Sequence, residues 1–186
     1  MRRMKLLWLL LPLAHGLAGC SKEIDVFEEV ELDNPKKIEI IKRRELYERV
    51  IHQLSPRWWK TRSEIFLFDK SNPDWSDNLR PLYLERLPEN QGYLLVTGIE
   101  SSTVCFQRGR PSSYYITFHL THNGAKEIPT PSRLEGVPTN LLLSGVLYRK
   151  PANGRVFTLP EKTELTRLGG YAERERKLLL TSKFGC

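Results

Sequence analysis

The chain has 186 residues, of which 40% are hydrophobic and 27% charged, and its formal net charge is +7. This length and apolar content suit one globular domain with a hydrophobic core. Basic and acidic residues are interspersed, which indicates a soluble surface and gives no sign of nucleic-acid binding.

The first nineteen residues are organised as a secretory signal. Basic residues at positions 2, 3 and 5 precede an apolar run over residues 6–14, and Leu17-Ala18-Gly19 stands directly before Cys20. The run is much shorter than the roughly 20 residues of a membrane-spanning helix, which disfavours a permanent transmembrane anchor. Loss of residues 1–19 would remove three basic and no acidic residues, and would lower the formal charge from +7 to +4.

The sequence Leu17-Ala18-Gly19-Cys20 resembles the lipobox of bacterial lipoproteins. The resemblance implies cleavage before Cys20, attachment of lipid to that cysteine, and anchoring by its acyl chains. Ser21 follows the cysteine where an aspartate would favour the inner membrane, so the resemblance implies the outer membrane, with the domain facing the periplasm. The alternative is an ordinary signal peptide in which Cys20 follows small residues by chance.

We expect residues 20–34 to be a short acidic tether between the lipid and a single domain over residues 35–186. Ile24, Val26, Val30 and Leu32 nevertheless alternate well enough for an edge strand. Asp33-Asn34-Pro35 is typical of a helix start, and Pro56 of a helix end. The apolar positions 38, 41, 47, 50, 51 and 54 fall largely on one helical face, which predicts one amphipathic helix over residues 35–55.

The rest of the chain has period-two apolar patterns bounded by Pro, Gly and Asn. They predict strands over residues 65–68, 81–87, 93–99, 103–106, 114–121, 141–148, 155–159 and 177–181. Asn123-Gly124 favours a hairpin turn, and Asn153-Gly154 a longer connection between strands. The expected fold is therefore mainly β: a β-sandwich or small barrel with one N-terminal amphipathic helix packed on it.

Two cysteines remain if Cys20 carries lipid. Cys105 and Cys186 would lie in a compartment where thiols are oxidised, so we predict a disulfide between them. It would hold the chain terminus and close a loop of about 80 residues. The alternative is two buried free thiols; a catalytic thiol is disfavoured because no base is evident nearby.

Histidine and cysteine patterns give no sign of catalysis or of a metal site. His119 and His122 are three apart, so on a strand they point to opposite faces, and His52 is expected to be a partly exposed helix residue. Hydrolase, phosphate-loop, metalloprotease and redox motifs are absent from the sequence. We expect no enzyme activity, no cofactor and no metal.

Pairs of acidic residues do not change this expectation. Glu28-Glu29 and the pair Glu173 and Glu175 are expected in flexible or exposed segments, without the desolvation that tunes a general acid.

The region from residue 57 to residue 75 has the most unusual local composition. The residues expected to bind a partner there are Arg57, Trp58, Trp59, Lys60 and Trp75. Tryptophan and arginine are common anchors of protein interfaces. Alternatively, one of the adjacent tryptophans closes the helix against the sheet, or one contacts lipid head groups.

A second resemblance concerns function. The stretch Val104-Cys105-Phe106, followed by residues 114–118 and Asn123-Gly124, is similar to small periplasmic immunity lipoproteins of type VI secretion effectors. The resemblance implies a protein that binds and neutralises a toxin in the periplasm. The alternatives are a structural or assembly lipoprotein of an envelope secretion or conjugation machine, and a carrier of an apolar ligand.

Overall fold

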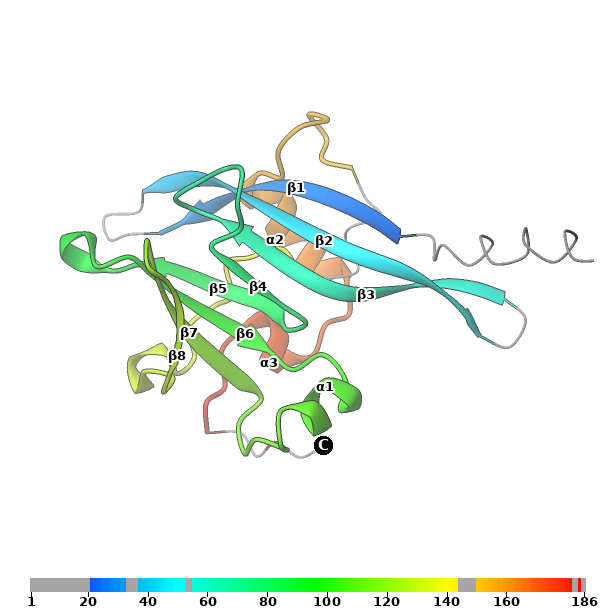
Figure 1. The fold of residues 1–186 in the computed structure, drawn as a ribbon. Helices are drawn as coiled ribbons and strands as arrows, with labels where there is room; N and C mark the ends of the chain where they lie inside the picture. Colours follow the sequence, from blue (N-terminus) through cyan, green and yellow to red (C-terminus); the bar gives the residue numbers. More distant parts are fainter. Residues whose placement is uncertain (1–20, 33–36, 53–54, 144–149, 182–183, 185–186) are drawn as a thin grey trace, which may run out of the picture.

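The chain is mainly β, as the sequence predicted. The computed structural model describes residues 21–32, 37–52, 55–143, 150–181 and 184. In this part of the chain eight strands form two antiparallel four-stranded sheets, and the helices are short (Figure 1).

The first sheet has the strand order β1-β2-β3-β4. Its strands are β1 (Ser21–Glu31), β2 (Ile38–His52), β3 (Ser55–Phe66) and β4 (Trp75–Asp77). β1 pairs with β2 over its whole length, from Ser21 opposite Glu48 to Glu31 opposite Ile38. The segment predicted to be a tether is therefore an edge strand of the domain, with Val26, Glu28 and Val30 buried.

The helix predicted over residues 35–55 is wrong, because residues 38–52 form β2. On a strand, alternate side chains share a face. The buried face of β2 carries Ile41, Arg43, Glu45 and Tyr47. Two of these residues are charged, so the apolar residues of β2 do not alternate along the sequence as they do in most strands. The apolar residues that remain have a helical spacing by chance.

β2 and β3 form a long hairpin. Their pairing runs from Lys42 opposite Phe66 to His52 opposite Ser55, with a register shift between Leu46 and Tyr47. β4 is short and covers only residues 63–65 of β3. The outer half of the hairpin consequently extends beyond the rest of the sheet (Figure 1).

The second sheet has the order β5-β6-β7-β8. Its strands are β5 (Arg80–Arg86), β6 (Tyr93–Gly98), β7 (Tyr115–Thr121) and β8 (Gly124–Ile128). The predicted hairpin is confirmed between β7 and β8, although the turn itself is His122-Asn123. Gly124 begins β8 with a φ of +119°, which favours glycine at this position.

Short helices replace several predicted strands. Residues 103–106 lie in α1 (Ser102–Gln107), which Ser101 caps by accepting the Val104 backbone N–H at 3.2 Å. Within residues 155–159, only Phe157 makes a β-bridge, to Glu28, before α2 (Leu159–Leu168) begins.

The two remaining strand predictions also fail where they can be compared. α3 (Glu173–Arg176) is followed by a single bridge between Lys177 and Pro138 rather than by a strand over residues 177–181. Residues 141–143 are not in a strand, and residues 144–148 lie outside the described residues.

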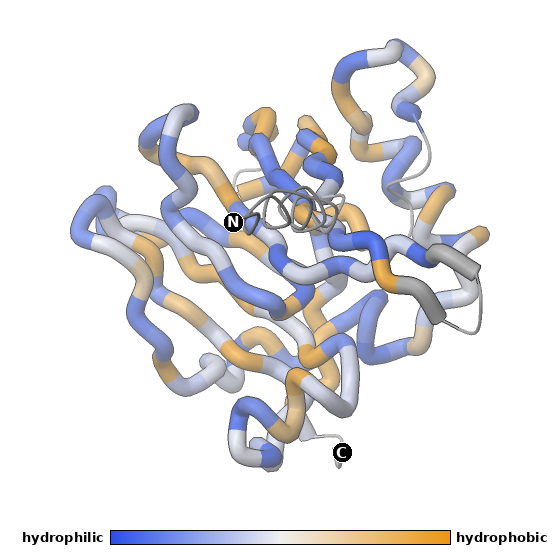
Figure 2. The backbone as a smooth tube through the Cα atoms, turned by 45° about the vertical axis from the view of Figure 1, so that its right-hand side comes forward, coloured by the Kyte–Doolittle hydropathy of each residue, from blue (hydrophilic) through white to orange (hydrophobic). Residues whose placement is uncertain are grey.

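One hydrophobic cluster joins the two sheets. The first sheet contributes Val30, Ile41, Ile65 and Trp75, and the second includes Leu82, Leu84, Leu95 and Phe118. Figure 2 shows apolar stretches within the strands of the second sheet, whereas the turns at the periphery are largely hydrophilic. A smaller cluster of Val26, Tyr47, Leu142 and Phe157 lies on the other part of the first sheet.

Candidate functional site

The residues predicted to form one partner-binding surface are separated in the structure. Trp75 is only 4% exposed and its ring lies 5.7 Å from that of Phe118, so it belongs to the core. Lys60 is largely buried and pairs with Glu45 and Glu100. Of the predicted set, Arg57, Trp58 and Trp59 remain on the surface.

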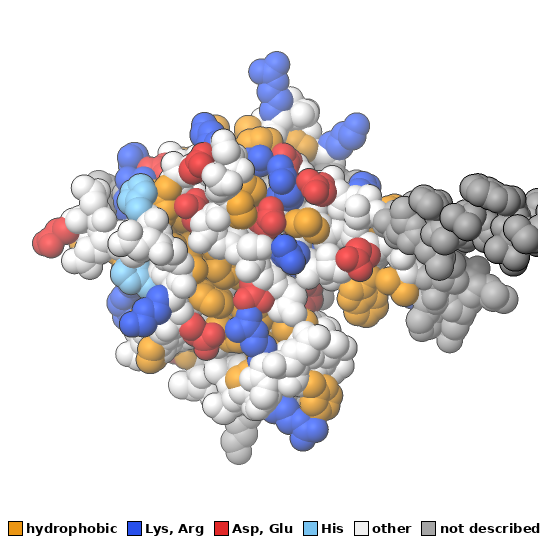
Figure 3. All heavy atoms as spheres, viewed as in Figure 1, with side chains coloured by type: hydrophobic (Ala, Val, Ile, Leu, Met, Phe, Trp, Pro, Cys, Tyr) orange, Lys and Arg blue, Asp and Glu red, His pale blue; other side chains and the backbone are white. Residues whose placement is uncertain are grey.

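These three residues lie on the part of the β2–β3 hairpin that we call the arm, residues 48–52 and 55–59. Trp58 is 38% exposed and Trp59 is 60% exposed. As neighbours on a strand they point to opposite faces. Because both are exposed, neither is the core residue that packing against a helix would have required. Figure 3 shows hydrophobic side chains on the surface over this half of β3.

Cys105 is disulfide-bonded and almost completely buried in α1. The other two cysteines, Cys20 and Cys186, both lie outside the described residues. The pairing of Cys105 with Cys186 therefore stays a prediction. The ring of Phe184 lies 5.3 Å from that of Tyr114, and both residues belong to the hydrophobic cluster that contains Cys105. Phe184, two residues before Cys186, thus packs on Tyr114 at the hydrophobic core.

His119 and His122 make separate contacts. His119 Nε2 is 2.7 Å from the Gln91 carbonyl oxygen, whereas the His122 ring stacks on Phe68 at 3.9 Å. Among the described residues, no group of three or more His, Cys, Asp or Glu side chains is arranged to hold a metal ion.

The outer edges of β1 and β5 face each other across what we call the seam, which residues 140–142 fill. Asn140 is the central residue of the seam. Its Nδ2 donates to the carbonyls of Glu31 and Leu84 at 3.0 and 2.7 Å, and its Oδ1 accepts the Leu84 backbone N–H at 2.8 Å. The Asn140 side chain therefore makes the hydrogen bonds that a neighbouring strand would make.

Lys162 of α2 closes the same seam from the other side. Its Nζ donates to the backbone carbonyls of Glu29, at 2.6 Å, and Asn140. It also lies 2.9 Å from a carboxylate oxygen of Glu28, which accepts the Leu142 backbone N–H at 2.6 Å. The lysine thus holds α2 on the edge of β1.

Glu28 is fully buried, which corrects the expectation of an exposed acidic pair. Burial alone would raise the pKa of its carboxyl group, but the charges of Lys162 and Arg43 and the hydrogen bonds to the carboxylate outweigh it and keep the pKa below its usual value. A carboxylate held in its ionised form cannot serve as a general acid near neutral pH.

Glu28 and Lys162 begin a chain of charges that alternate in sign through the interior. Its members, in order, are Lys162, Glu28, Arg43, Glu45, Lys60, Glu100, Arg80 and Glu175. The chain links α2, the first three strands, β5 and α3, so it ties both sheets to the C-terminal helices. The two helices consequently have fixed positions beside the seam.

Arg43 is the member of this chain of charges whose burial is not matched by hydrogen bonds. It is fully buried, and its Nε lies 3.7 Å from Glu28 and 3.4 Å from Glu45. Its three guanidinium nitrogens make no hydrogen bond to the described residues. Charge, rather than directional bonding, therefore compensates its burial.

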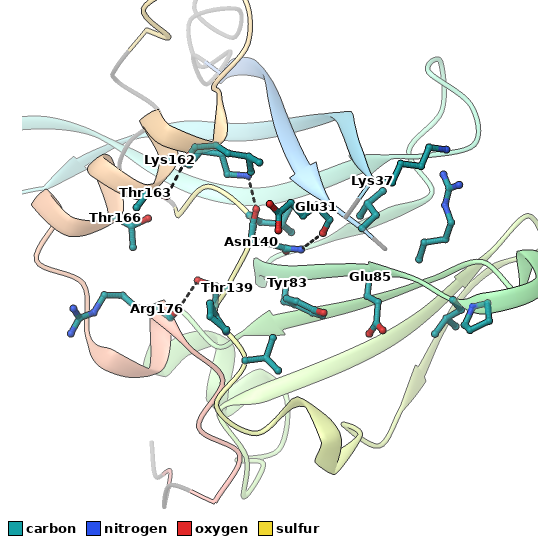
Figure 4. A pocket seen from close by; sticks show the side chains of 18 of the residues that line it. Glu31, Lys37, Tyr83, Glu85, Thr139, Asn140, Lys162, Thr163, Thr166 and Arg176 are labelled. Carbon is teal, nitrogen blue, oxygen red and sulfur yellow. Dashed lines mark hydrogen bonds between the residues drawn. The ribbon is translucent and has the colours of Figure 1, made fainter. Parts of the chain in front are cut away.

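The seam opens into a groove of about 1400 Å³. Figure 4 shows Lys162, Thr163 and Thr166 of α2 on one wall, and Tyr83 and Glu85 of β5 on the facing wall. Asn140, Glu31 and Thr139 lie between the walls, and Lys37 lies farther out beyond Glu31. Residues from five separate segments of the chain thus meet in one depression.

The groove offers binding groups of both signs. Lys37 pairs with Glu39 at 3.0 Å near one end, and Arg176 lines the other part. Burial raises the pKa of Tyr83, so its hydroxyl stays protonated and can donate a hydrogen bond. The arrangement is suited to recognition by hydrogen bonds, charge and apolar contact.

Sequence reasoning missed the groove and the buried charges. The start of α2 had a visible signal, because Thr158 and Glu161 are spaced as a capping box, and the Glu161 carboxylate accepts the Thr158 backbone N–H at 2.8 Å. The seam had no such signal, since Asn140 and Glu28 are 112 positions apart.

Comparisons with known proteins do not assign the chain to a family. No protein-family description, curated protein or solved structure matches it significantly. In the described part of the chain, no helix is long and apolar enough to cross a membrane.

Proposed function

We propose that this protein is a bacterial envelope lipoprotein, anchored through Cys20 in the outer membrane, that binds a segment of a protein partner in the groove. The position of the groove carries the proposal. Ser21, next to the anchor, begins β1, whereas Glu31 at the groove ends it. Ten steps of about 3.3 Å along the strand separate Ser21 from Glu31 by roughly 33 Å, which would set the groove away from the bilayer, toward the periplasm.

The size and chemistry of the groove favour a protein segment over an apolar ligand. Small-molecule sites are typically about 300–1,000 Å³ and mostly apolar. This groove is larger, is open, and carries Lys37, Glu85 and Arg176 among its lining residues. We interpret the two sheets as a β-sandwich whose filled seam supplies the rigid floor of this binding surface.

Among binding roles, we infer immunity against a secreted toxin. Neutralisation by occlusion needs a positioned, rigid surface and no chemistry of its own. The fixed floor of Asn140 and Lys162 meets that requirement, and the resemblance of residues 104–124 to immunity lipoproteins agrees with it. The toxin would be a protein that acts in the periplasm.

Substitution of Thr166 by arginine tests this proposal. A long cationic side chain on the groove wall should obstruct the partner segment, and a clash of about 2 kcal/mol would weaken the Kd about 30-fold. Ala125→Arg on exposed β8 adds the same charge away from the groove and serves as the control.

Each variant would be expressed in the periplasm with the toxin encoded beside its gene, and cell survival and calorimetric affinity would be measured. We expect protection by the wild type and by Ala125→Arg, and loss of protection with Thr166→Arg. A wild-type protein that forms no complex with the toxin and gives no protection would refute the immunity role. Equal binding by both variants would place the partner outside the groove.

A further inference from the structure

We propose that the arm is a second membrane contact, and that Trp58 and Trp59 lie among the lipid head groups of the bilayer that holds Cys20. The proposal rests on the lipid anchor of the proposed function, but concerns a different surface from the groove. It follows from the register of the first three strands.

Ser21, Glu48 and Trp59 lie side by side in one row across the sheet. Two spacings of about 4.8 Å place Trp59 roughly 10 Å from Ser21. Cys20 is covalently next to Ser21, and consecutive Cα atoms are about 3.8 Å apart. Trp59 is therefore level with the residue that follows the anchor.

The arm continues past this row in the direction opposite to the body. β1 runs from Ser21 into the domain, whereas Arg49 pairs with Trp58, and Val50 with Arg57, beyond the row. When Cys20 is held at the bilayer, these pairs are the part of the described chain that projects past the anchored end of β1. The polar interfacial layer on each side of the hydrocarbon core is several ångströms thick, enough to take up their side chains.

The residues on the arm suit this environment. Trp58 and Trp59 lie on opposite faces, and Val50, 44% exposed, shares a face with Trp59. Tryptophan prefers the membrane interface, where its ring is in an apolar medium and its N–H remains hydrated. Arg49 and Arg57 stand beside the apolar residues and can reach lipid phosphates with their charged ends.

The exposed apolar side chains on both faces distinguish a membrane from a protein as the occupant. A two-stranded hairpin is marginally stable in water, so an arm with exposed apolar groups on both sides needs cover. Head groups surround an inserted arm, whereas a protein would have to enter between the anchored body and the bilayer. The geometry therefore favours lipid.

Depth-dependent fluorescence quenching tests the contact. The lipidated protein would be placed in vesicles of phosphatidylethanolamine and phosphatidylglycerol whose acyl chains carry bromine near the head group. Quenching should occur in the wild type and be lost in the Trp58→Phe/Trp59→Phe variant, which keeps the buried Trp75. Trp75→Phe is the matched control, and quenching should persist in it.

The outcomes separate this inference from the proposed function. Equal, low quenching in the wild type and in the double variant, with lipid on Cys20 shown by mass spectrometry, would overturn the arm contact and leave groove binding intact. Absence of lipid on Cys20 would overturn both the anchor and the arm contact. If the arm is unquenched and Trp59→Ala abolishes complex formation with the toxin, its occupant is a protein.

Discussion

Replacement of Lys162 by methionine should destabilise the protein strongly, because it removes the closest counter-charge of a buried carboxylate. Lys162 Nζ lies 2.9 Å from Glu28 and donates to two backbone carbonyls. The other described cation near Glu28 is Arg43, 3.7 Å away and without a hydrogen bond to the described part of the chain. Breaking a buried ion pair costs about 3–5 kcal/mol, a large share of the roughly 5–15 kcal/mol by which domains are stable.

Urea unfolding at neutral pH, followed by circular dichroism, would measure the loss. Methionine is an unbranched side chain only one atom shorter than lysine, so the change is mainly in charge and hydrogen bonding. The matched variant is Lys162→Met combined with Glu28→Gln, which also removes the carboxylate charge but keeps an oxygen that can accept the Leu142 N–H. We expect the double variant to be more stable than Lys162→Met alone.

Two results would refute this reasoning. A loss below about 1 kcal/mol for Lys162→Met would mean that the interior is hydrated enough to support an unpaired carboxylate. Strict additivity of the two single substitutions would mean that Lys162 and Glu28 are not energetically coupled.

The remaining predictions concern the anchor, the disulfide, the seam and pH. Palmitate labelling should be lost in Cys20→Ala; the same label in wild type and variant would exclude this cysteine as the attachment point. Formation of a Cys105–Cys186 disulfide should make the oxidised protein lighter than the reduced protein by two hydrogens. The chain-entropy account gives this bond a stabilisation of about 4.5 kcal/mol. Two alkylatable thiols in the unreduced, denatured protein would contradict the prediction. Asn140→Ala should cost about 2–4 kcal/mol in urea unfolding because backbone groups on both sheet edges lose their partner, and a near-neutral effect would show that water replaces the amide. Because the folded-state pKa of Glu28 lies below its ordinary value of 4.5, its contribution is present above that pH and is lost as the pH falls further, so Glu28→Gln should show a shallower acid loss of stability than wild type.

The β-rich character of the chain could be predicted where strands have apolar alternation. Residues 81–87, 93–99 and 114–121 became β5, β6 and β7 with small shifts at their ends. These strands bury uncharged side chains, so the pattern and the burial coincide. The local alternation of apolar residues was therefore enough to predict these strands of the second sheet.

The first sheet shows why the rest could not be predicted. Arg43 and Glu45 occupy inner positions of β2 that a pattern assigns to solvent. They are tolerated only because Glu28 and Lys60 bring opposite charges from other strands. No window of sequence contains these partners, so their burial depends on tertiary contacts alone.

The candidate sites divide in the same way. Adjacency predicted only that Trp58 and Trp59 would not both be buried, whereas the structure exposes both. The burial of Trp75 was not predicted either, because a solitary tryptophan gives no sign of its face. The groove depends on residues between positions 31 and 176 that meet only after the sheets have packed.

The closed seam also bears on self-association. A strand edge with free backbone groups is a template for a strand of another molecule. Asn140 occupies these groups on β5, and Phe157 and Lys162 occupy them on β1. If the proposed lipid anchor confines the protein to the plane of a membrane, its copies would meet at high local concentration, and the occupied edges of β1 and β5 would then be closed to pairing between copies.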